Sequence, residues 1–78
     1  MKFGPDYYAI CIEDVKSWGT FKDRLRIRKE WLKRIRERFP KFDSQRHHSM
    51  GQAKIAAGRI KQVFPDAPIE ILPMCDVY

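Results

Sequence analysis

The stretch Arg46–Lys54, RHHSMGQAK, places an arginine and two histidines directly before an expected helix start. Side chains of these types can hold a metal ion, move a proton, or bind an anion together with the unpaired N–H groups of a helix end. Cations at a helix N-terminus oppose the helix dipole, so their position there needs a reason. Each of the three kinds of chemistry requires a different sequence spacing between the side chains involved.

Metal binding and catalysis are the two kinds that the spacing does not favour. Side chains of adjacent residues point apart in a helix and in a strand, so His47 and His48 form a poor chelating pair. Cys11 and Cys75 lie far from them in the sequence and are typical of small buried hydrophobic residues. The chain has no nucleophile elbow, no CxxC or HExxH motif and no glycine-rich phosphate loop. We therefore expect no metal, no cofactor and no enzymatic activity.

Anion binding fits the stretch better. Ser49 and Gln52 have the S-x-x-Q spacing of a capping box, which predicts a helix start at Ser49. Gly51 would let a ligand approach the helix backbone. Cationic or donor groups surround the same point in the sequence: Arg46, His47, His48 and, one turn on, Lys54. The alternative is a solvated polar loop in which Ser49 only caps the helix.

A basic stripe on an earlier expected helix is the stronger signal. The chain carries a net charge of +6, and segment 22–38 alone holds nine basic and three acidic residues, so this segment supplies the whole excess. Five of its bases follow spacings of 4, 3, 4 and 3, which place them on one face of a helix. They are Lys22, Arg26, Lys29, Lys33 and Arg36.

This stripe indicates a polyanionic partner. It would extend ~21 Å at 1.5 Å per residue, enough to meet several phosphates of a nucleic-acid backbone. We therefore predict a small basic protein that binds nucleic acid, either DNA or RNA, through this helix. The alternative is a protein-interaction module or inhibitor that docks on an acidic protein surface, as phage-type inhibitors of host machinery do. A merely solvated basic helix is the third interpretation.

The elements that must position these residues predict an α+β fold in one domain, residues 1–78. Residues 7–13 and 68–78 are typical of strands. Apolar residues at helical spacing predict one helix from Thr20 to Pro40 and another from Ser49 to Pro65, although 20–28 could also form a strand. A strand–helix–helix–strand path gives an antiparallel sheet with both helices on one face. Pro73, which lacks an N–H donor, is expected on an exposed edge.

The expected helices have defined inner faces and similar ends. Inward positions of the first are Phe21, Leu25, Leu32, Ile35 and Phe39, and those of the second are Met50, Ala53, Ala57, Ile60 and Phe64. The helices end in RIRERFP and RIKQVFP, either through an old duplication or because an aromatic residue followed by proline ends a helix well. Residues 52–60, QAKIAAGRI, resemble the last helix of double-stranded-RNA-binding domains, whose basic residues touch phosphates. The preceding sequence lacks the three-stranded sheet of that family, so the resemblance does not imply membership.

A two-stranded sheet is marginal alone, and strand 7–13 is apolar on both faces. We therefore expect its free edge to pair with a second chain in a homodimer. No apolar run approaches the ~20 residues of a membrane span, and the first residues lack the apolar core of a signal peptide. These features predict a cytoplasmic protein without a membrane partner.

Overall fold

The computed structural model describes residues 4–75, and the order of their elements is strand, short 3-10 helix, two α-helices and strand. The bounds are Tyr7–Ile12 for β1, Lys16–Trp18 for η1, Phe21–Arg38 for α1, Met50–Val63 for α2 and Ile69–Met74 for β2. The predicted α+β fold is confirmed, and segment 21–28 is helix rather than strand. Residues 76–78 of the predicted last strand lie outside the described residues.

Side-chain caps start both helices where the sequence predicts them. The Thr20 hydroxyl accepts a hydrogen bond from the Asp23 N–H, and the Asp23 carboxylate accepts one from the Thr20 N–H, which completes a capping box. The Ser49 hydroxyl accepts from the Gln52 N–H at 3.1 Å. The Gln52 side chain, however, accepts from the N–H of His48 instead of Ser49, so the second predicted box forms only in part.

The two helices also end with the same backbone geometry. Phe39 has φ −129° and ψ 81°, and Phe64 has φ −126° and ψ 79°. Each precedes a proline, which disfavours helical angles in the residue before it. Three residues later, the N–H groups of Phe42 and Ala67 donate to the carbonyls of Phe39 and Phe64, and both residues are buried. The repeated Phe-Pro end thus turns the chain back into the core twice.

Strands β1 and β2 pair antiparallel along their whole length. Pro73 lies opposite Tyr8, whose N–H and C=O point away from β2 and bond to His47. Residues opposite each other in such a position exchange no ladder hydrogen bonds, so the ladder needs no donor from Pro73. This explains how a proline fits inside β2.

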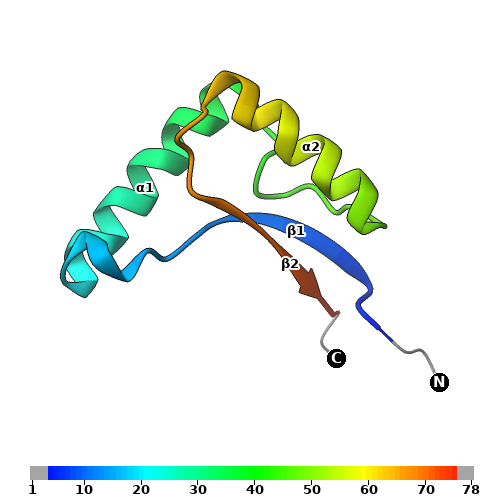
Figure 1. Cartoon of the computed structure of the whole chain (residues 1–78), viewed down its shortest axis with the longest axis horizontal. Coiled ribbons are helices and arrows are strands. Elements are labelled where there is room, and N and C mark those ends of the chain that lie inside the picture. The colour runs from blue at the N-terminus through cyan, green and yellow to red at the C-terminus, as the bar shows by residue number, and fades with distance from the viewer. Residues whose placement is uncertain (1–3, 76–78) are drawn as a thin grey trace.

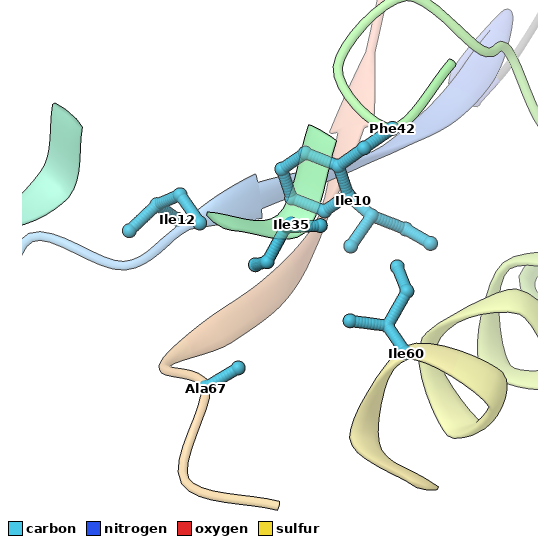
Figure 2. Close-up of a cluster of buried hydrophobic side chains, with 6 residues drawn as sticks. All are labelled: Ile10, Ile12, Ile35, Phe42, Ile60 and Ala67. Atoms are coloured by element: carbon cyan, nitrogen blue, oxygen red, sulfur yellow. The ribbon is translucent and has the colours of Figure 1, made fainter. Parts of the chain in front are cut away.

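Both helices cover the same face of the sheet, and their C-terminal ends meet above it (Figure 1). Figure 2 shows the side chains that fill the space between them: Ile10, Ile12, Ile35, Phe42, Ile60 and Ala67. The rings of Trp31 on α1 and Phe64 after α2 meet edge to face, with their centroids 6.5 Å apart. The core therefore lies where the helix ends, the sheet and the loop after α1 converge.

The predicted inner face of α1 is wrong in its first half. Phe21 is 66% exposed and Leu25 is 36% exposed, whereas Ile35 on the same stripe is fully buried. An 18-residue helix is ~27 Å long, longer than the ~20 Å of the six-residue strands beneath it. The N-terminal half of α1 therefore overhangs the sheet (Figure 1). On α2, predicted inner residue Met50 is likewise 37% exposed.

Candidate nucleic-acid interface

The overhanging helix carries the predicted basic stripe on one exposed face. All five side chains of the stripe are exposed. One shallow depression is lined by Lys22, Arg26, Lys29 and Lys33 together with Leu25 and Glu30. The next along the helix is lined by Lys29, Lys33 and Arg36 together with Leu32 and Glu37. The structure therefore brings the five residues together as a continuous surface, which we call the basic stripe.

Two members of the basic stripe already have carboxylate partners. Arg26 lies 3.6 Å from Glu30 and 3.9 Å from Asp23, measured between guanidinium nitrogen and carboxylate oxygen. Arg36 binds Asp43 through two nitrogens, with Nε 3.0 Å from Oδ1. Hydrogen bonding from Arg36 holds the pKa of Asp43 below its ordinary value. Sequence reasoning missed this second pair because Asp43 lies on the loop after α1.

The three lysines of the stripe keep their charge uncompensated. No carboxylate within residues 4–75 lies at ion-pair distance from Lys22, Lys29 or Lys33. Their positions cover ~16 Å of helix at 1.5 Å per residue. Lys22 stands on the overhanging half and is exposed. These lysines are the groups best placed to meet a row of anionic charges.

Other arginines of α1 stabilise the fold instead of extending the stripe. Arg24 donates to Asp14 at 3.0 Å, which ties the start of the helix to the connection after β1. The guanidinium of Arg34 lies 4.5 Å from the ring centroid of Trp31, a cation–π contact. Arg38 lies 5.3 Å from the ring of the residue that follows it. The segment that supplies the excess charge thus divides into the exposed basic stripe and arginines that contact other parts of the fold.

The Arg46–Lys54 stretch does not join the basic stripe. His47 is 6% exposed, and its backbone forms two hydrogen bonds with Tyr8, at 2.7 and 3.0 Å. His48 is exposed, and the Arg46 guanidinium lies 4.3 Å from the ring centroid of Tyr7. The two histidines therefore have different surroundings. Within the described part of the chain, no three His, Cys, Asp or Glu residues gather as a metal site.

The N-terminus of α2 and that of α1 lie at opposite ends of the molecule (Figure 1). Lys54 is exposed on α2 and lines a shallow depression with Lys61 and Glu70. Arg46, His48 and Lys54 consequently form a region separate from the basic stripe. Anion binding at the Arg46–Ser49 turn stays a prediction.

The free edge of β1 is shorter than expected. The loop before α2 occupies it at Tyr8 through His47, and beyond that point Ile10 and Ile12 are buried. The sheet face opposite the helices carries Ala9 and Leu72, the latter 37% exposed. Self-association through strand 7–13 stays a prediction.

Comparison with known proteins does not indicate a function, so the function must be argued from the site. No protein-family model, curated protein or solved structure matches the chain. Among residues 4–75, no helix combines the length and the apolar character that crossing a membrane requires.

Proposed function

We propose that the protein binds the phosphate backbone of a nucleic acid through the basic stripe of α1. The observation that carries this proposal is the row of three exposed lysines, on a helix that overhangs the core, with no carboxylate of residues 4–75 at ion-pair distance. Binding phosphates there breaks no existing ion pair and releases the condensed counterions of the nucleic acid. Contacts of this kind position the protein and do not read bases. Binding should therefore depend little on sequence.

The salt dependence of the affinity tests how many cations bind phosphate. On duplex DNA, each neutralised phosphate contributes a slope of about −0.9 to log K against log salt. Three lysines predict a slope of about −2.7, and participation of both arginines would bring it to about −4.5. A slope near zero would contradict the proposal. Parallel titrations with duplex DNA and duplex RNA show which of them the stripe prefers.

A matched pair of double variants separates the stripe from net charge. Lys29→Glu with Lys33→Glu should lower affinity for every sequence by more than about tenfold, because two phosphate contacts become repulsive. Arg59→Glu with Lys61→Glu makes the same charge change on exposed positions of α2 and should have a much smaller effect. Circular dichroism checks that both variants fold. If the α1 variant binds as well as the wild type, the stripe is only a solvated face.

An acidic protein surface is the second candidate partner. Phe21 and Leu25 are exposed at the overhanging end beside Lys22. Burying apolar side chains against a protein surface contributes more binding free energy than placing them beside phosphate groups. This candidate predicts that a protein co-purifies with the chain and is lost on Phe21→Ala. The nucleic-acid proposal predicts co-purifying material that absorbs at 260 nm and is retained by the same variant.

A further inference from the structure

A hollow of about 390 Å³ lies between the end of α1, the loop that follows it and α2. Core side chains close its floor, among them Ile10, Phe42 and Ile60, and two of these, Ile10 and Ile60, face each other in Figure 2. Its walls keep accessible apolar surface, because Phe39 and Ala56 are only half-buried. Hollows that hold small molecules have volumes of ~300–1,000 Å³ and mostly apolar walls. This hollow therefore has room for a compact ligand.

Three cationic side chains stand at the rim of the hollow. They are Arg38 of α1, Lys41 of the loop and Arg59 of α2, and all three are exposed. No carboxylate within residues 4–75 lies at ion-pair distance from any of them. Asp43, on the same loop as Lys41, is held by Arg36. The hollow thus combines apolar walls with positive charge that the described residues do not neutralise.

The helix dipoles account for only part of this charge. The C-terminal ends of α1 and α2 meet beside the hollow (Figure 1), and a helix C-terminus carries a partial charge of about −0.5. Three cations contribute +3, so about +2 remains after both helix ends are neutralised. Stabilising the helix ends therefore does not require all three cations, and the remainder favours an anionic ligand.

We propose that this hollow binds a small amphipathic anion, a carboxylate with a short aliphatic body. The body packs against Phe39 and Ala56, which keep accessible surface, and the carboxylate accepts hydrogen bonds from the rim cations Arg38, Lys41 and Arg59. The buried floor only closes the bottom of the hollow. An inorganic anion would leave the apolar walls in water, and an uncharged apolar molecule would make no charge-assisted hydrogen bond.

This site is distinct from the basic stripe. No residue of the stripe lines the hollow, and the lining residues of the hollow lie on the loop and on α2 as well as at the end of α1. A duplex backbone fits a row of cations along a helix, whereas a hollow walled on several sides fits a short body. The inference therefore goes beyond nucleic-acid binding.

An NMR titration of the isotope-labelled full chain with octanoate tests the proposal. At ~150 mM NaCl the Debye length is ~8 Å, which suppresses attraction from distant charges. We expect saturable shifts in the amide signals of Gln45 and Ala56 and in the Nε–H signal of Arg38, and none at Lys22 or Lys29. Acetate, which lacks the apolar body, and octylammonium, which reverses the head-group charge, should each bind at least tenfold more weakly than octanoate.

Two matched variants test the role of the rim. Lys41→Glu should weaken octanoate binding about tenfold or more, because it reverses a charge at the hollow. Lys61→Glu makes the same change at an exposed position of α2 that lines the depression beside β2 instead, and should alter binding less than twofold. Circular dichroism checks that both variants fold, and the wild-type comparison of the three probes remains decisive if Lys41→Glu does not.

Four results would overturn the proposal. Equal binding of acetate would show that charge alone attracts the probe, and equal binding of octylammonium would show that apolar contact alone does. Shifts confined to Lys22 and Lys29 would place octanoate on the overhanging half of α1. Absence of saturable binding would show that the hollow takes no such ligand. None of these results alters the salt dependence that tests nucleic-acid binding, so the two proposals fail separately.

Discussion

His47 and His48 are adjacent in the sequence but have opposite surroundings. The backbone pairing with Tyr8 draws His47 into the core region, while His48 stays at the surface and donates its N–H to Gln52. Nothing in the residue types reveals which histidine is buried, because the partner of its backbone, Tyr8, lies 39 positions earlier in the chain. The sequence does predict that the pair would not chelate well, since adjacent side chains diverge.

The Arg36–Asp43 pair should make stability depend on pH in acid. Because the folded-state pKa of Asp43 is lowered, its contribution to the free energy of unfolding is complete above the ordinary pKa of ~3.9 and is lost as pH falls through the folded value. Asp43→Asn should therefore lower the melting temperature at pH 7. The gap from wild type should begin to narrow as pH falls below about 3.9 and should close once pH is below the folded-state pKa of Asp43. A gap that persists unchanged at low pH would show that the ion pair is not its cause.

Asp66→Asn is the control for this measurement. Asp66 is exposed, and no basic side chain within residues 4–75 lies at ion-pair distance from it. Thermal melts of this variant should follow the wild type across the same pH range.

The two thiols should react at different rates. Burial raises the pKa of the Cys11 thiol, and the negative charge of Glu70 raises it further. Less of this thiol is therefore ionised at pH 8. Cys75 is exposed. Mass spectrometry during iodoacetamide treatment should show Cys75 alkylated first, and the difference should disappear in denaturant. Faster reaction at Cys11 in the folded chain would contradict its burial.

At the scale of elements, α1 is a helix with one anchored half. Ile35→Ala should destabilise the protein by about 2–5 kcal/mol, because the fully buried side chain leaves a cavity in the core. Phe21→Ala, on the same stripe but 66% exposed, should change stability by no more than about 0.5 kcal/mol. Urea unfolding measures both. Similar losses for the two variants would show that the overhanging half is packed in solution.

The sequence predicts the elements well because their boundaries depend on local chemistry. Thr20 and Ser49 start the helices as caps, and the Phe-Pro pairs end them. The overhang of α1 and the bridge between Tyr8 and His47 depend instead on which distant surfaces meet. Arg28 shows the difference well. Its place among apolar positions is visible in the sequence, but the space between β1 and α1 that it lines exists only after these elements are packed.

At the scale of the whole molecule, charge and core are unevenly distributed. The core gathers where the C-terminal ends of the helices meet, while the lysines of the basic stripe extend toward the overhanging end. Repulsion among like charges on α1 should weaken the compact state at low ionic strength. The molecule thus separates the surface that we propose for nucleic-acid binding from the contacts that hold it folded.

Added salt should therefore stabilise the chain. Raising NaCl from 10 to 200 mM should increase the melting temperature by about 4 °C, because screening reduces repulsion more than it weakens the few exposed ion pairs. The Lys29→Glu, Lys33→Glu variant should show a smaller increase, since its repulsion is already relieved. Calorimetry in both buffers checks this. A fall in melting temperature with salt would mean that attractive pairs dominate.

The pairing of β1 with β2 has a kinetic consequence. Tyr7 and Met74 lie side by side although almost the whole described chain separates them, whereas each helix forms from neighbours. Contacts of such long sequence separation form slowly, since a large loop must close first. The helices should consequently form before the sheet, and closure of the strands should limit the folding rate. A short covalent link between the ends of the two strands would shorten that search, and the chain would then fold faster.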